Sequence, residues 1–393
     1  MRKKLHYLNY QILVPYLILL VFGWVMVYSA SSDILLLNGL KASAYGVKQA
    51  EFDVFAVGVA CFVFASKLSN FQNRKFVFPF LYLCFAMLIL LVFKRIFKGN
   101  AAAINGAVGW IDLGPINIQP LEFAKLGLVL YLAFLLERRD GKIAPGTIFE
   151  SLINPAIVSV FMMALVVVEP DIGGTAILFM ITLVMFATCG VPTKIAVWWI
   201  LGVLLAVLGI FFLLVKWNPS FLQKSYQYQR IMSFLHPFEL EKKGGAQLVN
   251  SYYAIHNGGL FGVGLGNSVQ KRGYLPEPYT DFILSIIAEE LGIVGACIVV
   301  GQLFYLIWSI MEVGVHAISQ FNSLVCFGVA TIILMECIFN IGAVIGLLPI
   351  TGVTLPFISY GGSSVVVLSA GIGLVLNISA NERKKQEEAA SVL

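Results

Sequence analysis

The chain has 393 residues, of which 59% are hydrophobic and 12% charged, and its net charge is +5. With a mean hydropathy of +0.88, this composition excludes the usual two or three soluble domains and indicates an integral membrane protein. Six cysteines without C-x-x-C spacing and four histidines without H-E-x-x-H argue against a disulfide framework and a zinc site, and the modest charge gives no reason to expect nucleic acid as a partner.

Apolar runs recur along the whole chain, most of them long enough to cross a hydrocarbon core of roughly 30 Å. The first run lacks an A-x-A cleavage site, so we interpret it as a retained helix and not as a secretory signal. The sequence contains no internal repeat and is expected to form a single integral-membrane domain over 1–393. It predicts an all-α polytopic membrane protein with about ten transmembrane helices, at 11–29, 52–67, 76–93, 121–136, 153–168, 174–189, 195–215, 283–310, 324–345 and 364–379.

The distribution of cations predicts which side of the membrane each end faces. Ten spans put both termini on one side, and the segments on that side hold thirteen of the 26 Lys and Arg. The short loops opposite hold five, and the long segment 216–282 counts little because long segments cross largely regardless of charge. We therefore predict an N-in, C-in protein with a large extracellular loop between helices seven and eight, at 216–282, and a cytoplasmic tail at 380–393.

The first polar interruption is "NGAVGWIDLGPINIQPLEFAKL", at 105–126. Its glycines and prolines indicate a loop that ends at a helix start, where Pro120 suits the first turn and Glu122 the positive helix end. Glu122 and Lys125 lie three residues apart, close enough to pair. They either form a buried ion pair that locks two helices or belong to a functional interior, which charges inside a span usually mark.

The second interruption, "EPDIGGT" at 169–175, joins the fifth and sixth spans. A turn with one proline and two glycines has an evident structural role, and Asp171 suits the cap of the next helix. A catalytic role for Asp171 stays open as the alternative.

The long segment carries the third group of polar residues. Glycines at 258, 259, 262, 264 and 266 superficially resemble a dinucleotide fingerprint, but no predicted strand precedes them, so we reject that interpretation. The glycines are better explained by backbone that lies close to a ligand or to another segment. Arg230, Lys271 and Arg272 are suited either to an anionic group or to anionic lipid headgroups.

The fourth interruption is "LLPITGVTLPFISYGGSS", at 347–364, whose prolines and glycines forbid a regular helix. Irregular backbone at membrane depth is tolerated only where protein buries it or where it lines a watery cavity. We expect this loop to fold into the outer mouth of the bundle, with a purely structural re-entrant plug as the alternative.

Together these loops predict one external cavity. Its cations would neutralise a diphosphate and stabilise it as a leaving group, and Asp281, just before the eighth span, could accept a proton from an attacking hydroxyl. Three functions stay open on chemistry alone: a transferase that uses a lipid diphosphate, a lipid or solute transporter, and a receptor without turnover. The cavity residues would be Asp281, Glu277, Arg230, Lys271, Arg272, Ser359, Asn267 and Gln270.

Five motifs in order resemble the SEDS family (shape, elongation, division and sporulation), which includes FtsW, RodA and SpoVE. They are the 105–126 stretch, "PDIGG", "YQYQRIMSFLHPF", "NSYYAIHNGGLFGVGLGNSVQKRGYLPEPYTDFILSIIAEELG" and "GLLPITGVTLPFISYGGSS". The likeness runs from the first span to the last. Within the family, "GLGNSVQK" before "YLPE" and the first span are similar to the division branch of Gram-positive bacteria, that of FtsW.

The resemblance implies a peptidoglycan glycosyltransferase that polymerises lipid II outside the membrane with loss of undecaprenyl diphosphate. Asp281 in "YTDF" matches the family's essential acid and is the candidate that deprotonates the acceptor 4-hydroxyl, with inversion at the donor carbon. Substrate-binding roles fall on Arg230, Lys271 and Glu277, on Gln270 in the same cavity, and on Lys125, Glu122 and Ser359 in nearby motifs.

The resemblance also implies partners and a location. A class B penicillin-binding protein transpeptidase and other divisome proteins are the expected partners, and the plasma membrane at the division septum is the expected site. No cofactor follows from the motifs, although a diphosphate held in an acidic cavity makes Mg²⁺ or Mn²⁺ a candidate. Which residues would ligate such a metal stays unknown.

Four positions depart from the family pattern. Gly109 stands where relatives carry an arginine, so a phosphate contact is missing there. Leu121 replaces a serine, Gly174 a threonine, and Tyr279 a histidine. The last change removes a titratable neighbour of the proposed base.

Two rival functions use the same features. A lipid II flippase would need polar residues that continue deep into the bundle, where Glu336 and Asn340 of the ninth span are available and are spaced to pair with one another. A scaffold of the division machinery would carry only a vestigial cavity. An elongation polymerase of the RodA type is the alternative within the family.

Overall fold

The computed structural model describes residues 2–98, 109–112, 114, 117–139, 146–217 and 226–390. The motif at 105–126, the long segment 216–282 and the tail 380–393 are therefore described in part. Within these residues, ten helices have 17 or more residues. They are α2 (Tyr10–Leu37), α3 (Ala44–Ala65), α5 (Arg74–Lys98), α6 (Pro120–Glu137), α7 (Ile148–Val168), α8 (Ile172–Thr188), α9 (Thr193–Trp217), α12 (Ile283–Val315), α13 (Gln320–Val344) and α14 (Gly362–Ala390).

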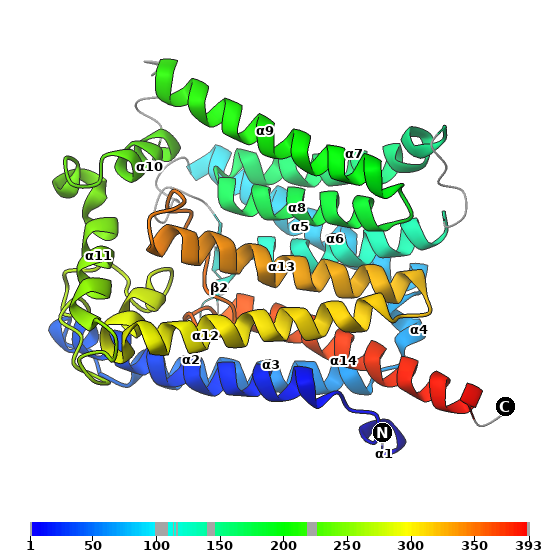
Figure 1. The fold of residues 1–393 in the computed structure, drawn as a ribbon, viewed down its shortest axis with the longest axis horizontal. Coiled ribbons are helices and arrows are strands. Elements are labelled where there is room, and N and C mark those ends of the chain that lie inside the picture. Colours follow the sequence, from blue (N-terminus) through cyan, green and yellow to red (C-terminus); the bar gives the residue numbers. More distant parts are fainter. Residues whose placement is uncertain are drawn as a thin grey trace.

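The long helices run side by side as one bundle (Figure 1). Both termini lie at one end of it, and the short helices α10 (Tyr226–Leu235) and α11 (Ala246–Gly258) lie at the other. This arrangement places the described part of the long polar segment opposite the termini, as an odd number of spans before that segment and an even number in total would require. Short helices α1 (Arg2–Leu5) and α4 (Leu68–Phe71) lie near the terminal end.

Burial distinguishes central from peripheral helices. In the apolar window of α14, 89% of the residues are buried, against 72% in α13 and 6% in α9. α13 packs against α6, α8 and α12, while α14 packs along α3. Figure 1 shows α9 along the upper edge of the bundle, so lipid would surround most of its apolar surface.

Each of the ten predicted spans coincides with one long helix, which confirms the all-α polytopic fold. Within the described residues, seven of the helices are long and apolar enough to cross a membrane. The other three differ for identifiable reasons: α8 has 17 residues, and α3 and α6 each carry three charged residues. The count of ten spans and the N-in, C-in orientation stay predictions.

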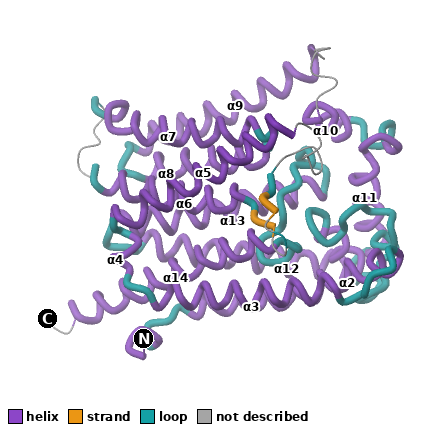
Figure 2. Tube along the Cα trace, turned by 180° about the vertical axis from the view of Figure 1, so that it is seen from behind, coloured by secondary structure: helices purple, strands orange, loops and turns teal. Residues whose placement is uncertain are grey.

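Helix α6 begins where the sequence predicts. Pro120 is the first residue of α6, where its missing N–H costs no hydrogen bond. Before it, β1 (Ile111–Asp112) and β2 (Asn117–Ile118) form a two-stranded antiparallel hairpin, which pairs Ile111 with Ile118. Figure 2 shows this hairpin (orange) among the loops near the ends of α12 and α13. β2 is held to α14, because Ser363 Oγ donates to the carbonyl of Asn117 over 3.1 Å.

The eighth predicted span, 283–310, is not one continuous helix. Gly292 has φ 74° and ψ −179°, which is not helical and breaks α12 into a first part, 283–291, and a second part, 293–315. A side chain at Gly292 would clash, because its Cβ would lie 2.3 Å from the carbonyl oxygen of Leu260. Glu289 and Glu290 precede the break, but the helix as a whole is apolar enough to count as one span, so hydropathy alone did not reveal the break.

The long segment packs as ordered structure on this break. After α10 and α11, with the π-helix η2 (Glu241–Gly245) between them, the chain forms the glycine-rich loop and then the turn that carries Asp281. The expectation that the glycines allow a close backbone approach is confirmed, since a Cβ at Gly258 would lie 2.0 Å from the carbonyl oxygen of Ala288. The predicted irregular loop after α13 is likewise non-helical from 349 to 361.

Candidate active site

Asp281 lies in the turn just before α12, with its side chain half-buried. Thr280 Oγ1 donates to its Oδ1 over 3.0 Å. Its backbone carbonyl accepts a hydrogen bond of 2.8 Å from Asn340 Nδ2 of α13, and the same amide nitrogen donates to the carbonyl of Val353 over 2.8 Å. Asn340 therefore ties together the Asp281 turn, helix α13 and the loop before α14.

Ser359 holds the same turn from the loop side. Its Oγ donates to the carbonyl of Thr280 over 2.6 Å and accepts from the backbone N–H of Leu355 over 2.8 Å. The backbone N–H of Tyr360 adds a bond of 2.9 Å to the carbonyl of Tyr279. The structure thus places Ser359 beside Asp281, as expected, with its hydroxyl engaged by backbone groups.

The environment of Asp281 makes its carboxylate more basic. Burial raises the pKa of Asp281 above its ordinary value, and the exposed Glu277 carboxylate adds to this. The hydrogen bond from Thr280 and the positive charge of Arg230 act in the opposite direction and lower that pKa. A carboxylate with a raised pKa is a better proton acceptor than an ordinary aspartate, which is what a general base needs.

Arg230, on α10, is the cation whose charge reaches this aspartate. Its Nη1 donates to the carbonyl of Ile350 over 2.8 Å, which anchors the guanidinium over the irregular loop. The loop accommodates it closely at Gly352, where a Cβ would lie 3.7 Å from Nη1. The structure thus brings together Asp281, Arg230 and Ser359 from three separate elements.

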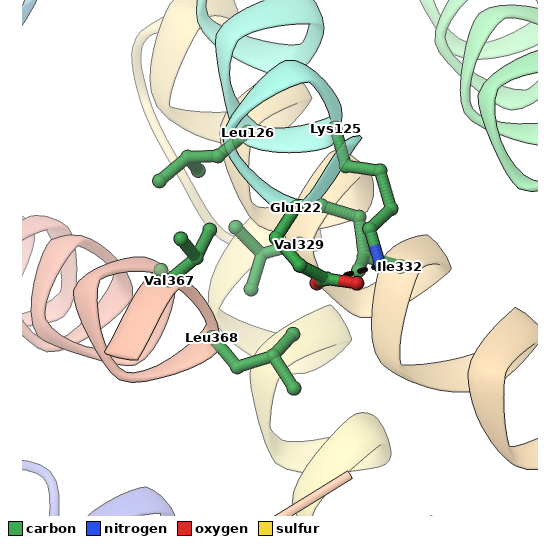
Figure 3. Close-up of a pocket in the computed structure, with 8 residues that line it drawn as sticks. Glu122, Lys125, Leu126, Val329, Ile332, Val367 and Leu368 are labelled. Atoms are coloured by element: carbon green, nitrogen blue, oxygen red, sulfur yellow. Dashed lines mark ion pairs between the residues drawn. The ribbon is translucent and has the colours of Figure 1, made fainter. Parts of the chain in front are cut away.

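Glu122 and Lys125 form the ion pair that their spacing predicts, with Lys125 Nζ 2.8 Å from Glu122 Oε2. Lys125 Nζ also pairs with Glu336 of α13, so one buried ammonium faces two buried carboxylates. Figure 3 shows Glu122 and Lys125 projecting from α6 beside Val329. The adjoining cavity is about 10 Å³, close to the minimum that holds one water.

The structure corrects the expected pairing within the ninth span. Glu336 pairs with Lys125, and Asn340 bonds to the two backbone carbonyls near Asp281. Although Glu336 and Asn340 are one helical turn apart, each one bonds to a residue on another element and not to the other. Sequence spacing could not reveal this, because those partners lie more than ten residues away.

Asp171 caps α8, as its position suggests, and its Oδ1 accepts from the backbone N–H of Gly174 over 2.7 Å. Burial raises the pKa of Asp171, while the charges of Lys125 and Arg230 lower it. The charges of the α6 ion pair and of Arg230 thus both act on Asp171. The sequence predicted no role for the neighbouring Glu169, yet burial raises the pKa of its carboxyl group to about 9. An acid directly after an apolar run was the available signal.

Lys271 and Gln270 belong to a different group of contacts. Lys271 Nζ is buried and lies 2.9 Å from Glu290 Oε1 and 3.2 Å from Ser29 Oγ of α2. The backbone N–H of Gln270 donates to Glu289 Oε2 over 3.2 Å. Glu289 and Glu290 are about two helical turns beyond Asp281. A substrate contact by Lys271 would require this buried pair to open, so its predicted role stays a prediction.

The two remaining charged candidates are at the surface. Glu277 is exposed and has a positive φ of 48°. Its carbonyl accepts from Thr280 Oγ1 over 2.9 Å, so its backbone shapes the turn that presents Asp281. Arg272 is exposed and lies 3.5 Å from Asp33 Oδ2.

Three tyrosine rings adjoin the Asp281 turn. The ring of Tyr45 at the start of α3 stacks on that of Tyr360 with centroids 5.0 Å apart and lies 4.9 Å from that of Tyr279. All three side chains are half-buried. Tyr279, where the resemblance leads us to expect a histidine, therefore joins an aromatic cluster that connects α3 to both loops of the site.

The side chains near Asp281 limit how a divalent cation could bind there. Within the described residues, no three side chains of His, Cys, Asp or Glu gather closely enough to hold a metal ion. A divalent cation at Asp281 would therefore take most of its oxygen ligands from a bound phosphate group and water, as Mg²⁺ commonly does. This metal stays a proposal.

Comparison with known proteins identifies relatives of this chain over nearly its whole length. The family model for the FtsW/RodA/SpoVE cell cycle proteins matches residues 10–384. The chain is 40% identical to a probable peptidoglycan glycosyltransferase FtsW of Lactococcus lactis subsp. lactis (strain IL1403), over 98% of this chain and 95% of that protein. It is 35% identical to the protein of the same name in Bacillus subtilis (strain 168), over 99% of this chain and 95% of that protein.

Solved structures share the fold. A chain from a structure titled "Structural coordination of polymerization and crosslinking by a peptidoglycan synthase complex" matches with a TM-score of 0.70 and 28% identity, covering 95% of this chain and 98% of that one. The rod shape determining protein RodA of Thermus thermophilus matches with a TM-score of 0.60 and 25% identity, covering 95% and 97%.

Proposed function

This chain belongs to the FtsW/RodA/SpoVE family of cell cycle proteins, and we propose that it polymerises lipid II into glycan strands during septal wall synthesis. Its relatives across nearly the full length are named peptidoglycan glycosyltransferases, so the chain is a glycosyltransferase of this kind. The observation that carries the more specific proposal is the half-buried Asp281, held between two loops beside Arg230.

The proposed reaction is a single displacement. The acceptor's sugar 4-hydroxyl attacks the anomeric carbon of the donor, and the bond from that carbon to the diphosphate oxygen breaks with inversion. The hydroxyl proton passes to Asp281, and undecaprenyl diphosphate leaves with the electron pair. The raised pKa of Asp281 supports this role, because general-base assistance is most effective when the base's pKa approaches the working pH.

Arg230 is the proposed partner of the leaving group. Its guanidinium is anchored through the carbonyl of Ile350 and its charge already acts on Asp281. A cation held in place near a developing diphosphate stabilises negative charge without reorganising during the reaction. Lys125 and Glu122 are proposed to contribute to substrate binding from α6, where their charges act on Asp171.

The proposed partners follow from relatives. One structural relative is part of a peptidoglycan synthase complex whose title joins polymerization to crosslinking. We therefore propose a class B penicillin-binding protein as the crosslinking partner of this chain in the plasma membrane. The FtsW names of the relatives favour the septum and the divisome over the elongation role of RodA.

One observation bears on the flippase alternative. A translocation path needs polar groups that continue through the bundle, and Lys125, Glu122 and Glu336 are the charged residues inside it at α6 and α13. In this structure Lys125 is paired with both carboxylates, and the adjoining cavity has room for about one water. This packing favours the transferase.

The test combines the purified chain with its partner transpeptidase and supplies lipid II. We expect glycan polymer from the parent and none from Asp281→Asn, which keeps the shape of the side chain and removes its basicity. Asp33→Asn is the matched control, since Asp33 pairs with Arg272 on the surface and should leave polymer unchanged. Movement of lipid II across liposomes in the parent and in Asp281→Asn alike, without polymer from either, would instead identify a flippase.

A further inference from the structure

The glycine-rich loop at 259–265 exposes apolar side chains at the polar end of the bundle. Leu260, Phe261 and Leu265 are 63%, 82% and 54% exposed. The chain from 257 to 270 contains no charged residue. Large exposed apolar side chains grouped on one loop are uncommon on a surface that faces water, and they mark an interaction site. We name residues 259–265 the interfacial loop.

The backbone of the interfacial loop is held in one conformation. The N–H groups of Val263 and Gly264 donate to the carbonyls of Glu289 and Glu290 over 2.9 and 3.0 Å. Gly262 has a φ of 81°, and a Cβ there would lie 2.2 Å from the carbonyl oxygen of Glu290. The loop can therefore present its side chains in a fixed direction, since its backbone is bonded to the first part of α12.

The interfacial loop is continuous with the membrane-facing side of α12. The N–H groups of Ile293 and Val294 donate to the carbonyls of Gly259 and Leu260 over 2.9 and 3.2 Å. Ile293, Val294 and Ile298 are themselves exposed, on a helix apolar enough to cross the membrane. Because this flank of α12 must face hydrocarbon, the side chains bonded alongside its outer end lie at the same boundary.

We propose that the interfacial loop inserts Leu260, Phe261 and Leu265 into the leaflet on its side of the membrane, at the boundary between headgroups and acyl chains. The occupant of this surface is lipid, because the surface extends the lipid-facing flank of α12 without a break. Apolar side chains next to a span commonly anchor such boundaries. This goes beyond the proposed reaction and does not depend on it.

Insertion would set the depth of the reacting group. The first part of α12, 283–291, joins the Gly292 break to the Asp281 turn, and its nine residues span about 13 Å at ~1.5 Å per residue. An anchor at one end of this short helix limits how far Asp281 can lie from that boundary. A lipid-linked diphosphate has its charged group at that level.

Site-directed spin labelling tests the proposal in the full chain, reconstituted into phosphatidylglycerol and phosphatidylcholine vesicles. The described exposed cysteines, Cys61 and Cys297, are first replaced by serine. A nitroxide is then attached at Phe261→Cys, and its relaxation by oxygen, which concentrates in hydrocarbon, is compared with that by a water-soluble nickel chelate. We expect the oxygen-to-nickel ratio at 261 to be several-fold higher than at Glu239→Cys, a matched position of the same segment that is 78% exposed.

The same labels distinguish the other occupants. A label at 261 that the nickel chelate reaches as readily as the label at 239 overturns the proposal. A label at 261 that is open to nickel in the protein alone and becomes shielded from both reagents when the partner transpeptidase is added would assign the surface to that partner, and also overturns it. An unfolding midpoint for Phe261→Cys close to that of the parent would show that the chain is folded, whatever the outcome at the membrane.

Discussion

Asn340 of α13 donates from its Nδ2 to the backbone carbonyl of Asp281 over 2.8 Å, which fixes the turn that carries the proposed base. The same nitrogen reaches the carbonyl of Val353, so the loop before α14 is joined to this turn through one side chain. The base is therefore positioned by residues far away along the chain.

Asn340→Leu should lower the polymerisation rate per folded molecule, in addition to lowering the free energy of unfolding. The change leaves two carbonyls without their donor, at a cost of about 1–3 kcal/mol, and it frees the Asp281 turn. A shift of about 1 Å at a reacting group can reduce a rate by roughly 10²-fold. The checks are the polymerisation rate and the thermal unfolding midpoint.

Asn322→Leu is the matched control for that change. Asn322 is buried near the opposite end of the same helix and donates to Glu382 Oε1 over 2.6 Å. It should lower the unfolding midpoint to a similar extent and keep the rate per folded molecule. Equal loss of rate in both variants would contradict the positioning role of Asn340.

The pH dependence of stability should reveal the cost of ionising Asp281. Its folded pKa lies above the ordinary value near 3.8, so the folded state binds this proton more tightly than the unfolded state does. Stability from this group is present at low pH and is lost as pH rises through the folded pKa. Asp281→Asn should thus be at least as stable as the parent at neutral pH, with the difference vanishing in acid.

Activity should depend on pH in the opposite sense to stability, with a lower rate at low pH. The rate falls as pH decreases through the raised pKa of Asp281, because the base becomes protonated, so the acidic limb should lie above the ordinary aspartate range. A polymerisation profile checks this. A limb at the ordinary value would mean that the half-buried carboxylate of Asp281 is not the group that titrates.

Lys271→Met should destabilise the chain, because it leaves Glu290 as an uncompensated buried charge. Breaking such a pair typically costs about 3–5 kcal/mol, whereas replacing both partners by apolar residues is often neutral. The double variant Lys271→Met with Glu290→Met should therefore recover much of the unfolding midpoint. Measuring KM for lipid II in the recovered double variant separates the two roles: an unchanged KM indicates a structural pair, and a raised KM indicates a substrate contact.

Tyr279→Ala should loosen the Asp281 turn, while Tyr279→Phe should not. The ring contacts with Tyr45 and Tyr360 are worth about 0.5–1.5 kcal/mol beyond area burial, and phenylalanine keeps them. We expect the alanine variant to lose both stability and rate, and the phenylalanine variant to stay near the parent. A large loss in Tyr279→Phe would show that the hydroxyl itself takes part.

Features that depend on neighbours within a few residues could be predicted from the sequence. Apolar runs located all ten long helices, since crossing a hydrocarbon core requires about 20 such residues. Pro120 marked the start of α6, Asp171 the cap of α8, and the spacing of Glu122 and Lys125 their ion pair. Helical geometry fixes each of these distances, so no knowledge of the rest of the chain was needed.

The partners of buried polar groups were decided only by the tertiary structure. Lys125 meets Glu336, Lys271 meets Glu290 and Ser29, and the break at Gly292 exists because the glycine-rich loop lies against it. In a chain this apolar, most sides of a helix look alike, so hydropathy does not show which side meets which neighbour. A buried charge must find its counter-charge wherever packing brings one, and that choice belongs to the whole bundle.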